Sequence, residues 1–356
     1  MKILLISNMY PSEHSPHLGA FVKNARDSLI DNGYQVKLCV LDRTSSSKFA
    51  KLKNYSYLCF KIFWLTLISR YDYLYVHYAS HCYFPVKLAN IFRRKKVIIH
   101  VHGGDVKRLS GANALFFKIK EYIVKFALYD STKIIFPSEA YLDYTTKEFN
   151  IFPGKCSVSA SGGVDIECFT YKPRTGGRHL KILFAGRLIK SKRVDIAISA
   201  VDEFAKRVHK KVSLSIVGNG PELKALKEQA ISSSQYLDII FHEAVGQSKL
   251  AQMYHQHDFL IYPSESESLG LVPLEAMASG VIPVLSDIPA FKEFIVNGEN
   301  GFLCNNLNDY INALVELYSL SVQEREIIRK NAFSIVKNNY TKEMAEKSLL
   351  EAFKCL

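Results

Sequence analysis

Short apolar runs alternate with longer stretches of helical periodicity along most of this chain. We expect strands in the short runs and helices where apolar residues recur every three or four positions. The helix predicted at residues 20–33 places Phe21 and Leu29 on one side and stops at Gly33. The other elements predicted in this half are strands at 3–7, 35–41, 73–77, 97–102, 133–137 and 158–160, and a helix at 115–128.

Around residues 171–178 the composition shifts to Pro, Gly and basic residues, which predicts a linker. Beyond it the alternation restarts, so we expect two α/β, Rossmann-like domains, at residues 1–174 and 175–340, facing a central cleft where ligands bind. The predicted elements here are strands at 182–185, 213–217, 239–241, 259–262 and 282–285, and helices at 194–209, 222–232, 249–255, 272–279, 310–320 and 341–353.

Composition excludes several classes of protein. The 356 residues are 48% hydrophobic and 22% charged, as in a globular enzyme, and no apolar run reaches the length of a membrane span. The seven Cys form no C-x-x-C pair, so neither a zinc ribbon nor a dithiol site is predicted. No signal peptide is recognised, and we expect reduced thiols in a cytoplasmic protein. No strand is followed by G-x-G-x-x-G, which argues against a nicotinamide cofactor.

The net charge of +12 is concentrated in the first half of the chain. Residues 1–172 contain 24 Lys and Arg against 13 Asp and Glu, and residues 93–96 are the densest basic cluster. This basic first half predicts an anionic partner, which is a membrane surface, a lipid pyrophosphate or nucleic acid. A membrane surface is favoured over nucleic acid because no nucleic-acid-binding module is recognised. A solvated Lys-rich surface is the alternative.

The segment from Glu267 to Glu275 carries the strongest candidate chemistry. Glu267 lies in a loop rich in Ser and Gly, and a helix that opens near Gly270 would direct its free N–H groups toward a phosphate. Glu275, one turn later, is then placed to hold the ribose of a nucleotide, and Glu267 the hydroxyls of a sugar. The alternative is a surface loop followed by a helix whose Glu275 is solvated.

Two cations follow the first predicted strand of the second half. Arg187 and Lys192 lie five positions apart, where they can converge on one anion. A departing diphosphate develops negative charge, which fixed cations stabilise without a metal ion. Ordinary basicity at the end of a strand is the alternative interpretation.

Three features of the first half are weaker candidates. His102 follows a strand and precedes two Gly, so it is predicted to face the cleft, while His77 and His100 are given structural roles. Asp105 is predicted either to bind a hydroxyl or to cap the next helix. Gly19 opens a helix, where it would let backbone N–H groups approach a phosphate.

Together these segments resemble the GT-B glycosyltransferases of family 4, which are bacterial sugar transferases for surface polysaccharides and glycolipids. The resemblance covers nearly the whole chain. It is carried by Tyr10-Pro11, Gly19-Ala-Phe-Val22, His102-Gly-Gly-Asp105, Ser161-Gly-Gly-Val-Asp165, Gly186-Arg-Leu188 with Lys192, Val217-Gly-Asn-Gly-Pro221, Pro263-Ser-Glu-Ser-Glu-Ser-Leu-Gly270, Glu275-Ala-Met-Ala-Ser-Gly280, Asn297-Gly298 and Asn300-Gly-Phe302.

The resemblance implies an acceptor-binding N-terminal domain, a C-terminal domain that binds a UDP- or GDP-sugar, and a last helix, 341–356, that crosses back to the first domain. It implies transfer with retention of anomeric configuration. No Asp-x-Asp-like cluster is recognised, so neither a metal ion nor another cofactor is expected. The implied roles are diphosphate binding for Arg187, Lys192 and Gly19, ribose binding for Glu275, sugar and phosphate contacts for Glu267 with the backbone of Leu269 and Gly270, and an approach to the reacting sugar for His102.

The predicted reaction moves a hexose-type sugar to a hydroxyl of a glycan or lipid-linked glycan during surface polysaccharide synthesis. The expected location is the cytoplasm, at the inner face of the cytoplasmic membrane. A nucleotide-sugar 2-epimerase on the same fold and a noncatalytic sugar-nucleotide-binding partner are alternatives. A basic nucleic-acid binder is a further alternative, which predicts salt-dependent affinity for DNA or RNA.

Overall fold

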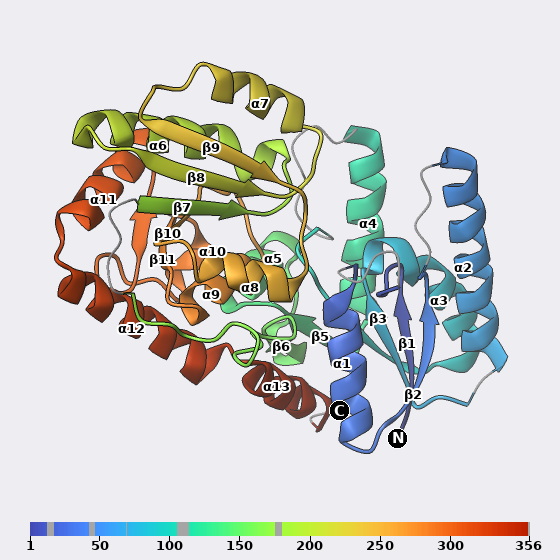
Figure 1. Ribbon diagram of the computed structural model, residues 1–356. Helices are drawn as coiled ribbons and strands as arrows, with labels where there is room; N and C mark the ends of the chain where they lie inside the picture. Colours follow the sequence, from blue (N-terminus) through green and yellow to red (C-terminus); the bar gives the residue numbers. More distant parts are fainter. Residues whose placement is uncertain (13–17, 43–46, 69, 105–113, 175–179, 355–356) are drawn as a thin grey trace. The chain divides into compact units, whose positions relative to one another are not determined.

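The chain forms two compact units. The computed structural model describes residues 1–12, 18–42, 47–68, 70–104, 114–174 and 180–354. One unit comprises Met1–Gly162 with Ala345–Leu356, and the other comprises Gly163–Met344 (Figure 1). Each is built on one six-stranded sheet, and every strand pair in both sheets is parallel among the residues described.

The sheet of the first unit has the strand order β2-β1-β3-β4-β5-β6. Its strands are β1 (Lys2–Ser7), β2 (Gln35–Val40), β3 (Tyr73–His77), β4 (Lys96–His100), β5 (Lys133–Phe136) and β6 (Cys156–Val158). The helices are α1 (Ala20–Asp31), α2 (Lys48–Ile68), α3 (Ala79–Arg93), α4 (Ala114–Asp130), α5 (Glu139–Phe149), the short η1 (Pro153–Lys155) and α13 (Lys342–Lys354), which belongs to this unit from Ala345 onward.

Successive residues of the buried strands point to opposite faces of this sheet, and each face meets different helices. Leu4 packs in the cluster that contains Ile62 of α2 and residues of α3 and α4. Ile3 packs in the cluster that contains Leu29 of α1 and Phe353 of α13. Both faces are therefore covered, as a parallel sheet requires.

The sheet of the second unit has the order β12-β11-β10-β7-β8-β9. Its strands are β7 (Leu180–Ala185), β8 (Val212–Val217), β9 (Leu237–His242), β10 (Phe259–Tyr262), β11 (Ile282–Ser286) and β12 (Phe302–Cys304). The helices are η2 (Lys190–Lys192), α6 (Val194–Val208), α7 (Leu223–Ile231), α8 (Gln247–Tyr254), α9 (Leu271–Ala278), α10 (Pro289–Lys292), α11 (Leu307–Ser319) and α12 (Val322–Asn339).

The predicted fold class, α/β with two Rossmann-like domains, is confirmed, and each predicted strand overlaps an observed one. The sequence analysis missed β12 and the helices α2, α3, α5, α10 and α12. In α2 the reason is visible, since apolar residues lie on the buried side, as Ile62 does, and on the exposed side, as Phe60 does. Such a helix has no single apolar stripe to detect.

The described helices are too short or too polar to span a membrane. The longest described helix, α2, has 21 residues, but four Lys interrupt it. Across the described ranges, no helix combines the length and the apolar character needed to cross a bilayer.

Each sheet reverses the direction of its strand order at one place. In the first unit the chain moves outward one way from β1 to β2 and the other way from β3 to β6, so the reversal lies between β1 and β3. In the second unit it lies between β7 and β10. In open parallel sheets, ligands bind beyond the carboxyl ends of the strands at such a reversal, which fixes where a site is to be sought.

We predict that Phe353→Ala lowers the free energy of unfolding of the first unit by about 3–5 kcal/mol. Phe353 is only 1% exposed, and its ring packs edge-on against Tyr75, 5.1 Å away. Urea unfolding followed by fluorescence of Trp64 reads this unit, because Trp64 is the single Trp of the chain. Lys347→Ala, on the exposed side of α13, is the matched control, and equal effects of the two substitutions would contradict the packing.

Candidate functional site

In the second unit, two loops at the strand reversal carry most of the predicted residues. One follows β7 and contains Arg187 and Lys192, and the other follows β10 and contains Glu267. The backbone N–H of Glu265 donates to the carbonyl of Ser191 over 2.8 Å, which holds the two loops together. The neighbouring strands β7 and β10 thus bring residues 75 positions apart into one cluster.

The centre of this cluster is an ion pair between Lys192 and Glu267. The Nζ of Lys192 donates to the Oε1 of Glu267 and, over 3.1 Å, to the hydroxyl of Tyr262. The two charged side chains are only 12% and 14% exposed. A partly buried pair needs both members, since removal of one leaves a desolvated charge behind.

Tyr262 is a residue of this cluster that the sequence analysis missed. It is the last residue of β10, it is buried, and its hydroxyl is hydrogen-bonded to Glu267. Burial and the charge of Glu267 raise the pKa of Tyr262, so the hydroxyl remains a donor. A polar residue at the carboxyl end of a strand was the available signal.

Arg187 differs from Lys192 in being exposed. Its guanidinium forms no hydrogen bond or ion pair within the described part of the chain. Its positive charge acts on Tyr262, whose pKa it lowers against the effect of burial. Arg187, Lys192 and Glu267 therefore gather around one tyrosine, and Arg187 leaves its five N–H donors available to an anion.

The helix α9 begins where the sequence analysis expected a helix to open. The residue that precedes it, the N-cap Gly270, has a φ of 98°, and a Cβ there would lie 2.5 Å from the ring of Phe291, so only Gly fits. Within the described residues no side chain caps this end. Leu269, just before Gly270, is buried.

Glu275 is buried, so the alternative of a solvated side chain is wrong. It is 8% exposed and lies in the middle of α9. Burial raises its pKa to about 8, and a hydrogen bond with Gln247 at the start of α8 opposes the rise. The charge of its carboxylate contributes, after burial, to the raised pKa of Tyr254 and of Cys168. No direct contact joins it to Lys192 or Glu267 in the described structure.

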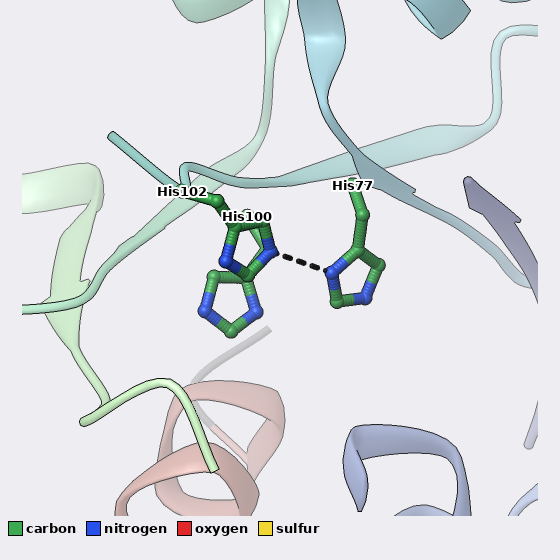
Figure 2. A group of neighbouring side chains, drawn as sticks. All are labelled: His77, His100 and His102. Carbon is green, nitrogen blue, oxygen red and sulfur yellow. Dashed lines mark hydrogen bonds between the residues drawn. The ribbon is translucent and has the colours of Figure 1, made fainter. Parts of the chain in front are cut away.

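In the first unit, His77, His100 and His102 form one cluster at the carboxyl ends of β3 and β4 (Figure 2). The Nδ1 of His77 is hydrogen-bonded to the Nε2 of His102 over 2.8 Å, and the two rings are within 8° of parallel. The Nδ1 of His100 is hydrogen-bonded to the hydroxyl of Tyr75 over 2.6 Å. One imidazole must donate in the bond between His77 and His102 and the other must accept, so the tautomers of these two residues are coupled.

The three imidazoles of the His cluster are close enough to suggest a metal site, but their nitrogens do not converge on one point. Its ligand-capable nitrogens all lie within 4.8 Å of one another, and burial lowers the pKa of all three imidazoles, which keeps them neutral. However, the bonded nitrogens of His77 and His102 point at each other rather than at a common centre, as Figure 2 shows. An ion would have to break that bond, and among the described residues no carboxylate joins the set.

Gly19 precedes the helix that packs against the other side of the His cluster. It precedes α1 with a φ of 73°, and a Cβ there would meet the carbonyl oxygen of Met9 at 2.9 Å. Its position brings Phe21 onto His102, with ring centroids 4.2 Å apart. The helix that Gly19 opens thus covers one side of His102. Asp105 lies outside the described residues.

Comparison with known families identifies what these units resemble. Residues 172–334 match the family model described as Glycosyl transferases group 1. Residues 13–138 match the model described as Glycosyl transferase 4-like.

Two curated relatives and one solved structure illustrate the similarity. The GtfA subunit of a UDP-N-acetylglucosamine–peptide N-acetylglucosaminyltransferase from Streptococcus pneumoniae serotype 4 is 31% identical over 180 residues, 48% of this chain and 35% of that protein. Glycogen synthase of Mycobacterium tuberculosis H37Rv is 30% identical over 210 residues, 57% of this chain and 49% of that protein. The chain therefore matches half or less of the length of these relatives. The crystal structure of Anabaena Alr3699/HepE in complex with UDP and glucose matches all of both chains, with a TM-score of 0.75 and 16% identity, which shows a shared fold.

We predict that Glu275→Gln removes a pH dependence of stability. The folded state holds a proton on Glu275 up to about pH 8, whereas the unfolded chain releases it near the ordinary pKa of 4.5. The free energy of unfolding therefore falls as the pH rises between these values, by at most about 1.4 kcal/mol per pH unit, and is constant above. Urea unfolding followed by circular dichroism from pH 5 to 9 checks this, with Glu228→Gln as the exposed control. An unchanged slope in Glu275→Gln would contradict it.

We predict the opposite pH dependence for the first unit. Burial lowers the pKa of His100 to about 3 and that of His77 well below 6.5, so the unfolded chain binds more protons than the folded unit as the pH falls below 6.5. Stability is therefore lost toward acid. Urea unfolding at several pH values, followed by Trp64 fluorescence, measures this loss of stability. His100→Gln, which still accepts from Tyr75, should reduce the slope, while the exposed His209→Gln should not. Equal slopes in the two variants would refute the assignment.

Proposed function

This chain belongs to the group 1 glycosyltransferases, and we propose that it transfers a hexose-type sugar from a nucleoside-diphosphate sugar to a hydroxyl of a glycan or lipid-linked glycan. The observation that carries the proposal is the cluster of Lys192, Glu267 and Tyr262 at the strand reversal of the second sheet. The Anabaena structure that matches the whole chain holds UDP and glucose, which supports a nucleotide-sugar donor.

The diphosphate of the donor is assigned to Arg187, Lys192 and the start of α9. Arg187 supplies an unpaired planar fork of donors, and Lys192 supplies a cation that Glu267 and Tyr262 hold in place. The uncapped N–H groups after Gly270 favour a phosphate oxygen by hydrogen bonding and by the helix dipole. Fixed donors of this kind stabilise a charge without reorganising during the reaction.

The ribose of the donor is assigned to Glu275. A buried carboxyl group whose pKa is about 8 lacks enough partners in the unliganded protein. Two ribose hydroxyls that donate to it would favour its ionised form and lower that pKa, so donor binding would release a proton near neutral pH. The contact would also distinguish ribose from deoxyribose.

We assign to the transfer step retention of the anomeric configuration, without participation of a metal ion. The bond from the anomeric carbon to the diphosphate breaks, and its electron pair leaves with the diphosphate, where Arg187 and Lys192 stabilise the charge. The acceptor oxygen bonds to the same face of that carbon, and its proton passes to the departing phosphate oxygen. Glu267 orients the sugar hydroxyls, and His102, fixed by His77, is the group of the first unit assigned to the reacting sugar. Acceptors of surface polysaccharide synthesis are the proposed class.

A titration series with matched ligands tests the donor site. UDP and GDP are first compared by calorimetry, and the preferred nucleotide is then paired with its monophosphate and its 2′-deoxy form. Arg187→Ala should weaken the diphosphate by about 10- to 100-fold and the monophosphate less, because charge-assisted bonds are lost. Glu275→Gln should weaken the ribonucleotide about tenfold and the 2′-deoxy analogue less, because that analogue already lacks one of the two hydroxyl contacts.

The controls separate loss of binding from loss of folding. Arg187 is exposed and unpaired in the described structure, so its removal leaves the fold intact, and Lys211→Gln removes an exposed cation just before β8, at the opposite edge of the sheet. Lys192 is a poorer probe because its loss leaves the partly buried Glu267 without its counter-charge. Unchanged nucleotide affinity in both Arg187→Ala and Glu275→Gln would overturn the proposed donor site. Product analysis with and without acceptor, and with EDTA, then distinguishes transfer from epimerisation and tests metal independence.

A further inference from the structure

The outer sides of α2, α3 and α4 form an exposed apolar surface, here called the aromatic face. Among the described residues these helices expose fourteen large apolar side chains, six on α2 and four each on α3 and α4, at 42–79% of full exposure. They include Phe60, Trp64, Phe84, Phe92 and Tyr122. The three helices stand side by side on one face of the first sheet (Figure 1).

The aromatic face is larger than chance exposure produces. A whole aromatic side chain offers about 150–250 Å², so these exposures sum to on the order of 1,000 Å², above the roughly 300–600 Å² of the largest patch on a typical monomer. Isolated exposed apolar residues need no explanation, but a set on adjacent helices does. The aromatic face is therefore a candidate interaction surface.

Each of these helices buries one apolar side in the core, and its exposed apolar residues form a second stripe on the outer side. On α3, Phe84, Leu88 and Phe92 recur at every fourth position and point outward. Cys82 and Val86 of the same helix point into the core. An apolar outer stripe contributes nothing to the core beneath it, so its function must lie outside the unit.

The three helices are held as one rigid surface. Lys87 of α3 forms a 2.7 Å ion pair with Asp130 of α4 and lies over the ring of Phe126 at 5.2 Å. Arg93 of α3 donates to the carbonyl of Leu67 in α2. The stripes therefore keep a fixed relation to each other.

The charge around the aromatic face is predominantly positive. The helices α2 and α3 carry six Lys and Arg and no Asp or Glu, and α4 carries three basic residues against two acidic ones. Lys51 and Lys53 on α2, and Arg94 just after α3, are exposed beside the apolar stripes. Long basic side chains beside aromatic rings suit a surface whose apolar interior lies beneath an anionic layer.

We propose that the aromatic face docks on an anionic lipid bilayer, with its rings among the upper acyl chains and its Lys and Arg at the headgroups. A second copy of the chain fits less well, because two identical basic faces would meet with like charges, and protein interfaces are depleted in Lys. The proposal extends the proposed function, since it places the first unit against the membrane that carries a lipid-linked acceptor. Donor binding is measured without lipid, so either idea can fail alone.

The single tryptophan of the chain lies within this surface, which makes the test site-specific. Trp64 is 49% exposed. Full-length protein is mixed with vesicles of phosphatidylcholine alone or of equal parts phosphatidylcholine and phosphatidylglycerol. With the anionic vesicles we expect a blue shift of Trp64 emission, quenching by lipids brominated on their acyl chains, and co-sedimentation that weakens with salt.

Paired variants separate the two contributions to docking. Phe60→Ser with Phe92→Ser should weaken vesicle binding at least tenfold, whereas Ile231→Ser, which removes an 86% exposed residue of the second unit, should not. Lys51→Gln should weaken it about fivefold on anionic vesicles, and Lys224→Gln should not. Unchanged thermal unfolding and nucleotide affinity of every variant show that folding is intact.

Each outcome decides the proposal. Absence of both the Trp64 shift and co-sedimentation at low salt overturns it. A shift that depends on protein concentration without lipid, together with a dimer in light scattering, overturns it in favour of self-association. Binding that the control substitutions weaken as much as the test substitutions also overturns it, because the docking surface would then lie elsewhere.

Discussion

Parallel strand pairing is the constraint from which the arrangement of this protein follows. Because every strand pair in the described sheets is parallel, all carboxyl ends of one sheet lie at the same edge, and the reversal of strand order opens that edge at one place. The loops after β7 and β10 meet there in the second unit, and the ends of β1 and β3 meet there in the first. Residues far apart in the sequence become neighbours for this reason alone.

Both units bury titratable groups at or near these edges, and they do so in opposite senses. Burial keeps Glu275 protonated and keeps His77, His100 and His102 unprotonated, so both sets are neutral at about pH 6, where an exposed Glu is ionised and an exposed His is largely protonated. Lys192 and Glu267 instead stay charged by pairing. Desolvated groups of this kind cost stability, and their concentration at ligand-binding edges is typical of functional sites. These groups thus reduce the stability of the fold at the edges where ligands are proposed to bind.

The helices α2 and α3 of the first unit carry apolar residues on both their buried and their exposed sides. In α2, Ile62 completes the core while Phe60 and Trp64 stay outside, and α3 repeats the pattern. A helix under ordinary selection for folding alone would carry polar residues on its outer side. The same double character that hides these helices from a search for one apolar stripe marks the surface as a place for contact.

Local sequence determined the strands, the α/β class, the loops that carry Arg187, Lys192 and Glu267, and the helix that carries Glu275, because period-two and period-3.6 patterns and glycines at helix starts are local signals. It did not determine that Tyr262 would join Lys192 to Glu267, that His77 would fix His102, or that Glu275 would be buried. Those facts depend on which strands become neighbours and on how deeply each loop is packed. Pairing and burial are set by contacts across the fold, and no window of neighbouring residues encodes them.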